Sequence, residues 1–203
     1  LGIILIFIHR WKENSKNNNK DLIILSDFGR IDCVFANAGI NVFGGSFEEM
    51  NTEAYRKVLA VNLDGVFFTL RETIKHMVER SKNGDAGGSV VGVASLAGIE
   101  GAAKTQPYSS SKGGVISMIK GIAVEHARYG IRANTILPGW VATEMTSINQ
   151  SNQKFTDKVI GRVPMRRWGE PRDFSGIAAY LASDASAYHS GDMFIIDGAY
   201  AIF

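Results

Sequence analysis

The sequence contains only one cysteine, Cys33, among its 203 residues, so the chain cannot form an internal disulfide bond. Cys33 lies in the apolar run 31–36, where a buried thiol is a more common role than a nucleophile. The four histidines also lack the spacing of metal ligands. We therefore expect neither a disulfide framework nor a metal site. The low cysteine usage fits a reducing compartment, and we expect a cytoplasmic protein.

The sequence has no excess of one charge and no long hydrophobic run. Its formal net charge of +2 is too small to indicate a nucleic-acid or membrane partner. The apolar run at residues 1–8 is shorter than the ~20 residues that a helix needs to cross a bilayer. It also lacks the basic start and the cleavage site of a signal peptide. We predict a buried strand at residues 1–8, followed by a polar linker at residues 9–20.

The composition is that of an ordinary single globular domain, with 45% hydrophobic and 21% charged residues. Apolar runs of strand length alternate with longer helical patterns. The expected strands cover residues 31–36, 89–94, 131–137 and 193–196, and the expected helices cover residues 51–80, 108–129 and 171–181. This alternation predicts an α/β fold, namely a three-layer, doubly wound parallel sheet with helices on both faces. We expect the irregular or weakly helical residues 144–168 to form a lid over a site.

Polar or turn residues stand at the ends of three expected strands, at Asn37, Ser95 and Pro138. The carboxyl ends of parallel strands meet at one edge of the sheet, which is where ligands bind in open α/β sheets. The three strands therefore indicate one common site.

Tyr108, Lys112 and Ser95 can form a proton-transfer group at that edge. Tyr108 and Lys112 are four residues apart, which places them on one face of the expected helix. A phenol has an ordinary pKa of ~10, and a neighbouring ammonium lowers it toward the working range. Ser95 would hold a substrate oxygen beside the phenol. Taken by itself, the Tyr-x-x-x-Lys spacing also occurs by chance, and a serine after a strand is more often a helix cap.

Asn62 lies in the middle of the expected helix 51–80, for which Asn51 is the predicted N-cap. A buried amide needs hydrogen-bond partners. Two interpretations stay open: a satisfied core asparagine, or a residue at an opening of the backbone that directs its carbonyl to a water chain. The glycines inside helix 108–129 indicate the close approach of another backbone, a cofactor or a partner helix. They are Gly113, Gly114 and Gly121.

Taken in order, these motifs resemble the short-chain dehydrogenase/reductase family over residues 27–203. The matching elements are Asn37-Ala38-Gly39, Asn62, Gly87-Gly88-Ser89, Ser95, Tyr108 with Lys112, Pro138-Gly139 with Thr143, and Asp197-Gly198. The resemblance implies a Rossmann-like fold and an NAD(P)-dependent enzyme that interconverts a secondary alcohol and a carbonyl. It also implies a homo-oligomer, a dimer or a tetramer, formed through the two long helices and the last strand.

The resemblance implies a role for each matching residue. Tyr108 would be the general acid or base, Ser95 would hold the substrate oxygen, and Lys112 would bind the nicotinamide ribose and lower the phenol pKa. Asn62 would hold a water that links Lys112 to solvent. The remaining cofactor-binding positions are Asn37, Ala38 and Gly39 at the adenosine half, and Pro138, Gly139, Val141 and Thr143 at the carboxamide and phosphates. The cofactor would carry the hydride.

The sequence departs from the family at its beginning, because it contains no Gly-rich phosphate-binding turn. The first two βα units of the family are missing, and residues 1–26 form an atypical N-terminal segment before a domain at residues 27–203. The residue that would separate NAD from NADP belongs to the missing part. Without those units, strand 31–36 would lie near a sheet edge. We hypothesise that residues 1–8 pair with it.

Two functions remain open from the sequence. The first is an oxidoreductase acting on sugars, sugar acids or 3-oxoacyl thioesters, with Trp140 and residues 145–155 shaping the pocket. The second is a truncated, non-catalytic relative that folds or assembles without binding a dinucleotide, which the absent Gly-rich turn suggests.

Overall fold

The computed structural model describes residues 4–7, 27–42 and 45–203. Within them, five parallel strands form one sheet in the order β1-β2-β3-β4-β5. The strands are β1 (Ile4–Phe7), β2 (Cys33–Ala36), β3 (Gly88–Val93), β4 (Ile131–Pro138) and β5 (Met193–Ile196). The four strands predicted after residue 30 are confirmed, with ends that move by one or two residues. The linker predicted at residues 9–20 lies outside the described residues.

Strand β1 pairs in parallel with β2, with Ile4 opposite Cys33 and Phe7 opposite Ala36. The hypothesis that the N-terminal apolar run pairs beside strand 31–36 is therefore confirmed for Ile4–Phe7. Strand β2 consequently has a hydrogen-bonded neighbour on each side, which satisfies the backbone groups that an edge strand would expose.

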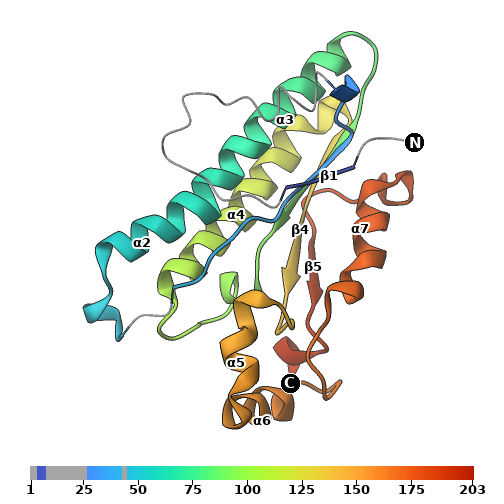
Figure 1. Cartoon of the computed structure of the whole chain (residues 1–203). Helices are drawn as coiled ribbons and strands as arrows, with labels where there is room; N and C mark the ends of the chain where they lie inside the picture. Colours follow the sequence, from blue (N-terminus) through green and yellow to red (C-terminus); the bar gives the residue numbers. More distant parts are fainter. Residues whose placement is uncertain (1–3, 8–26, 43–44) are drawn as a thin grey trace.

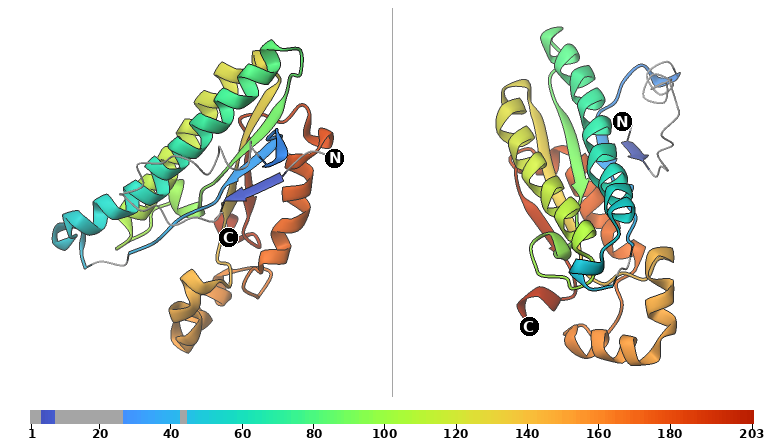
Figure 2. Two further views of the ribbon diagram at one scale, coloured as in Figure 1. Left: turned by 45° about the horizontal axis from the view of Figure 1, so that its top comes forward. Right: turned by 90° about the vertical axis from the view of Figure 1, so that its left-hand side faces the viewer.

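Helices cover both faces of the sheet (Figure 1). Helices α2 (Thr52–Leu59), α3 (Gly65–Lys82) and α4 (Gln106–His126) lie on one face, and α7 (Ser175–Ala182) lies on the other. The two shorter helices α5 (Ser147–Ser151) and α6 (Gln153–Arg162) lie beyond the carboxyl ends of the strands, as the turned views of Figure 2 also show. The structure thus confirms the doubly wound α/β fold.

Strands β2, β3 and β4 are buried on both faces along most of their length. Alternate residues face opposite layers: Val34 and Val90 pack with α3 and α4, whereas Phe35 and Val91 pack with α7. Cys33 belongs to the α7 side, is 1% exposed, and burial raises the pKa of its thiol to about 11. Cys33 is therefore a core thiol, as predicted.

The helices begin and end at the predicted signals. Asn51 caps α2, because its side chain accepts hydrogen bonds from the backbone of Glu53 and Ala54. Helix α4 begins two residues before the predicted Tyr108, with Pro107 in its first turn. Gly130 ends the following 3₁₀ turn with a left-handed φ of 72°. None of the helices in the described ranges is long and apolar enough to cross a membrane.

The helix predicted over residues 51–80 is interrupted. A π-helical segment, Ala60–Asp64, separates α2 from α3, and the backbone N–H of Gly65 bonds to the carbonyl of Ala60. A π-helical turn inserts one residue into an α-helix and opens the hydrogen-bond ladder. Asn62 lies at the centre of this segment. The opening of the backbone considered from the sequence is therefore present.

Candidate active site

Ser95 directly follows the buried end of β3 and begins a 3₁₀ turn, Leu96–Gly98. Its hydroxyl caps that turn by accepting a hydrogen bond from the N–H of Ala97 at 3.2 Å. The same hydroxyl lies near enough to the Tyr108 phenol to lower its pKa. Ser95 is therefore a cap and a partner of the phenol at once, and the two interpretations made from the sequence do not exclude each other.

Tyr108 lies in the first turn of α4, beside that serine. Burial raises the pKa of the phenol above its ordinary value, and the Ser95 hydroxyl opposes this change. The prediction that the phenol pKa is lowered is therefore wrong for this structure, because burial has the largest effect on it. The Lys112 ammonium lies over the Tyr108 ring, 5.6 Å from its centre.

Lys112 is 3% exposed, and its Nζ donates a hydrogen bond to the carbonyl of Val93 at 2.8 Å. Burial lowers the pKa of this ammonium to about 8. Gly39 lies against it, since a Cβ at Gly39 would be 3.3 Å from Nζ. An ammonium has three donors, and the bond to Val93 is its one hydrogen bond within the described part of the chain. The charge therefore keeps capacity for a ligand oxygen.

Asn62 is fully buried, and three hydrogen bonds use both ends of its amide. Its Oδ1 accepts from the N–H of Ile40 at 2.8 Å, and its Nδ2 donates to the carbonyl of Ile40 at 2.9 Å and to Ser111 Oγ at 3.1 Å. Asn62 is thus a satisfied core asparagine at a backbone opening. Its side chain hydrogen-bonds the residue directly after Asn37, Ala38 and Gly39, which follow β2. Of these three, Gly39 lies beside Lys112.

The second predicted cofactor segment follows β4. Gly139 donates to the carbonyl of Ile196 at 3.0 Å, and a Cβ there would lie 2.6 Å from that of Asp197, so this position requires glycine. Val141 forms a parallel bridge with Gly169. This segment, with Pro138 and Thr143, leaves the same edge of the sheet as Ser95 and the end of β2.

Trp140 connects the region after β4 to the helices beyond it. Its ring makes edge-to-face contacts with Phe155 at 5.3 Å and with Trp168 at 5.9 Å.

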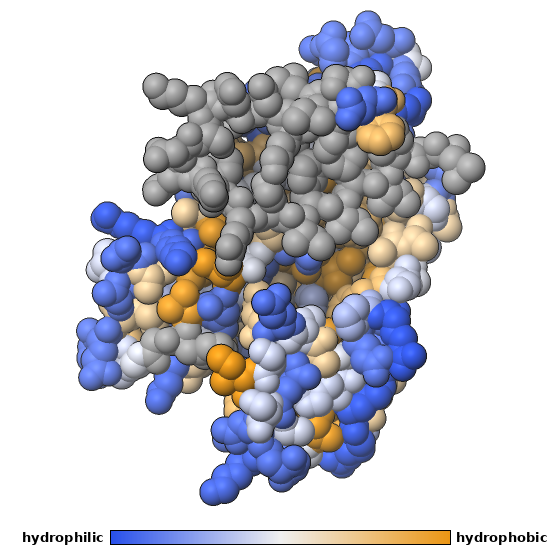
Figure 3. All heavy atoms as spheres, in the orientation of Figure 1, coloured by the Kyte–Doolittle hydropathy of each residue, from blue (hydrophilic) through white to orange (hydrophobic). Residues whose placement is uncertain are grey.

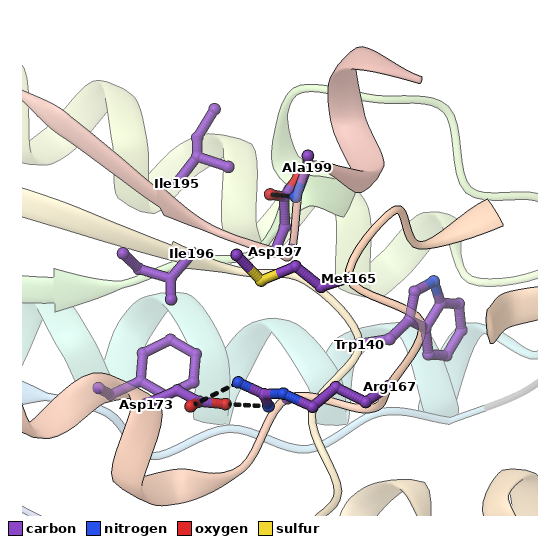
Figure 4. Close-up of a pocket in the computed structure, with 11 residues that line it drawn as sticks. Trp140, Met165, Arg167, Asp173, Ile195, Ile196, Asp197 and Ala199 are labelled. Carbon is purple, nitrogen blue, oxygen red and sulfur yellow. Dashed lines mark hydrogen bonds and ion pairs between the residues drawn. The ribbon is translucent and has the colours of Figure 1, made fainter.

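Trp140 also lines a cavity of about 380 Å³ near the end of β5 (Figure 4). Arg167 and Asp173 form an ion pair at 2.6 Å in that cavity, and the guanidinium lowers the pKa of the Asp173 carboxyl to about 2. The sequence analysis placed Trp140 at a pocket but missed Asp173, whose six-residue separation from Arg167 follows no helical or strand period.

The sequence analysis also missed Ser111, which connects Asn62 to α4. A serine between two residues of a motif carries no signal in the sequence that separates it from a solvent-facing helix residue.

The contact between Gly98 and Gly113 explains one of the glycines inside helix α4. A Cβ on Gly113 would lie 3.3 Å from the carbonyl oxygen of Gly98, so the predicted close approach of a second backbone is confirmed there.

A doubly wound parallel sheet that joins a serine, a tyrosine and a lysine at its carboxyl edge defines the chain as a Rossmann-like α/β protein. The chain belongs to the short-chain dehydrogenase/reductase family. The family described as enoyl-(acyl carrier protein) reductase matches residues 22–201. Solved structures agree: a gluconate 5-dehydrogenase from Burkholderia cenocepacia, in complex with NADP and tartrate, has a TM-score of 0.83 at 30% identity. That match covers 88% of this chain and 68% of the other.

Curated relatives have similar identities. The L-rhamnose 1-dehydrogenase (NAD(P)(+)) of Azotobacter vinelandii is 35% identical over 171 residues, 84% of this chain and 65% of the relative. The 5-keto-D-gluconate 5-reductase of Escherichia coli is 36% identical over 175 residues, 86% of this chain and 66% of the relative. The chain therefore spans about two thirds of the length of the curated relatives that it matches.

Proposed function

We propose that this chain carries the catalytic half of an NAD(P)-dependent oxidoreductase, which interconverts a secondary alcohol and a carbonyl. The observation that carries the proposal is the meeting of Ser95, Tyr108 and Lys112 at one edge of the sheet. The Ser95 hydroxyl acts on the phenol pKa, and the buried Lys112 ammonium lies beside the same ring. A hydroxyl, a phenol and an ammonium in this arrangement can bind an alcohol or carbonyl oxygen and move a proton on or off it.

In this mechanism Ser95 orients the substrate oxygen toward the Tyr108 hydroxyl. Tyr108 donates its proton to that oxygen in reduction and accepts it in oxidation. Lys112 holds positive charge near the phenol and has donors for ribose hydroxyls. Because the Asn62 side chain is already hydrogen-bonded, its backbone carbonyl would hold the water that returns protons from solvent. When bound, NAD or NADP supplies or accepts the hydride at the carbon atom.

The residues present fit the nicotinamide half of such a cofactor. The Lys112 ammonium keeps donor capacity, and Gly39 leaves the space beside it that a Cβ would fill. Val141 and Thr143 would bind the carboxamide and phosphates, and Asn37 and Ala38 would border the adenosine. No Gly-rich turn for the pyrophosphate occurs in the sequence, so the fit is to half of the dinucleotide. This observation favours the second candidate function, a relative that folds without binding dinucleotide.

We propose a polyhydroxylated substrate, a sugar or a sugar acid. The names of the Azotobacter and Escherichia relatives support this class. Two buried amide oxygens in residues close in sequence to the site, Asn41 Oδ1 and Gln106 Oε1, have no hydrogen-bond partner among the described residues. They follow Gly39 and precede Tyr108 by two residues each. Unpaired acceptors of this kind favour a ligand with several hydroxyl donors.

The test is a titration of the chain with NADH and NADPH, followed by fluorescence, and an assay of sugar and sugar-acid oxidation. We expect the parent chain to bind the dinucleotide at micromolar concentration. Turnover should fall by a factor of roughly 10² to 10⁴ in Tyr108→Phe, because that variant keeps the ring and loses the hydroxyl that donates the proton. Binding of the dinucleotide should persist in Tyr108→Phe. Absent or millimolar binding would support the non-catalytic relative, and unchanged turnover in Tyr108→Phe would remove the phenol from the mechanism.

We also propose a homo-oligomer. Val124 on α4 is 83% exposed and Phe67 on α3 is 43% exposed, while nothing lies within 4 Å of a Cβ at Gly121. Met193 and Ile195 leave one side of β5 partly uncovered. The face drawn in Figure 3 shows hydrophobic groups interspersed among hydrophilic residues. Sedimentation at micromolar concentration tests this proposal, and a monomer there would contradict it.

A further inference from the structure

A fully buried serine, Ser111, lies between the tyrosine and the lysine of the proposed site. Its Oγ donates a hydrogen bond to the carbonyl of Tyr108 at 2.7 Å and accepts one from Asn62 Nδ2 at 3.1 Å. A hydroxyl has one donor and two acceptor positions. Its donor is used inside α4, so its acceptor connects the catalytic helix to the π-helical segment.

That connection extends to the end of β2. Asn62 bonds both the N–H and the carbonyl of Ile40, and Gly39 directly before it lies so near Lys112 that a Cβ there would be 3.3 Å from Nζ. One amide therefore joins the segment after β2 to α4, and Ser111 is its contact on α4. Without the Ser111 hydroxyl, one buried N–H of Asn62 would lose its acceptor, and the amide would rotate or admit water to satisfy it.

The opposite side of α4 is held differently. A Cβ at Gly98 would lie 2.9 Å from the backbone carbon of Lys112, so the turn that begins at Ser95 packs directly on the helix backbone. In addition to its core contacts, helix α4 is held by backbone packing at Gly98 and by the Asn62–Ser111 hydrogen bond. A small rotation of α4 about the packed side would move Tyr108 and Lys112 relative to Gly39.

We propose that Ser111 is a positioning residue: through Asn62 its hydroxyl holds the turn of α4 that carries Tyr108 and Lys112 in register with the segment after β2. The neighbouring Ser110 provides a matched control. It is exposed, and its hydroxyl bonds the carbonyls of Gln106 and Pro107 within its own helix. The substitutions Ser111→Ala and Ser110→Ala remove the same group from adjacent positions of one helix.

The kinetic test rests on the proposed function. We expect Ser111→Ala to lower kcat roughly tenfold or more, with KM and dinucleotide affinity near those of the parent chain, whereas Ser110→Ala keeps the parent kcat. Ser111→Cys keeps a similar volume and a weak acceptor, so its kcat should lie between those of Ser111→Ala and Ser110→Ala. It replaces Ser111→Ala in the test if that variant does not fold. Because Ser111 acts through Asn62, the losses in Asn62→Ala and Ser111→Ala should not add in the double variant. Additive losses, or a parent-like kcat in Ser111→Ala, would overturn the inference.

A second measurement does not need turnover. The Lys112 ammonium is titrated by NMR of its side-chain carbon, with Lys112→Met assigning the signal. Burial lowers its pKa to about 8, so water admitted in Ser111→Ala should shift the midpoint upward, and Ser110→Ala should leave it in place. If the parent chain shows no turnover but this midpoint shifts, the inference stands and the proposed function fails. If turnover is present and the midpoint and kcat of Ser111→Ala match the parent, the inference fails and the proposed function stands.

Discussion

Replacing Gly98 with alanine should separate the turn that begins at Ser95 from helix α4. The added Cβ would lie 2.9 Å from the backbone carbon of Lys112 and 3.0 Å from the backbone nitrogen of Gly113. Carbon atoms in contact prefer about 3.5–4.0 Å, so the overlap is of the order of 0.5–1 Å. Both atoms belong to the interior of a long helix, which cannot yield locally as a flexible side chain would.

Overpacking of this kind costs about 1–3 kcal/mol. For a domain of this length, each kcal/mol lowers Tm by roughly 2–4 °C, so Gly98→Ala should melt roughly 2–12 °C below the parent chain. The same displacement should lengthen the contact between Ser95 and Tyr108 and lower turnover. Thermal unfolding followed by circular dichroism measures the first effect, and the oxidoreductase assay measures the second.

Gly101 supplies the matched control, because it lies in the same loop and nothing comes within 4 Å of a Cβ built there. Its φ is not in the left-handed region, so alanine adds no backbone strain. Gly101→Ala should therefore melt close to the parent chain, or slightly above it, because alanine reduces the entropy of the unfolded chain. Equal melting temperatures for Gly98→Ala and Gly101→Ala would refute the argument that backbone contact fixes the turn on α4.

Two further substitutions test the site. Lys112 has a pKa of about 8 in the folded chain and ~10.4 when unfolded, so the unfolded state binds more protons between these values. Stability should therefore rise with pH from about 8 to 10, by roughly 2–3 kcal/mol relative to Lys112→Met; parallel pH curves in denaturant titrations of the two proteins would contradict this. Trp140→Ala removes ring contacts to Phe155 and Trp168, each contributing about 0.5–1.5 kcal/mol. It should expose α5 and α6 to limited proteolysis while the sheet stays intact, and a cleavage pattern equal to that of the parent chain would count against the anchoring role of Trp140.

The sequence by itself determined the sheet and most of its helices. Strands buried on both faces consist mostly of apolar residues, so β2 and most of β3 are visible as apolar runs. Strand β4 is visible from its apolar ends, although it also carries Arg132, Asn134 and Thr135. Asn51, Pro107 and Gly130 mark helix ends through local backbone chemistry that needs no distant partner. Ser95, Tyr108 and Lys112 were predicted to meet because strand ends and helix faces have fixed periods.

Only the tertiary structure decided how these parts act on one another. The direction of the Tyr108 pKa shift depends on how much water reaches the phenol, which spacing does not encode, so the expected effect of Lys112 was overestimated. The roles of the π-helical opening at Asn62 and of the Ser111 hydroxyl depend on hydrogen bonds to residues 22 and 49 positions away along the chain. Local sequence fixes which conformations a segment prefers, whereas desolvation and long-range hydrogen bonds arise only when separate segments exclude water from one another.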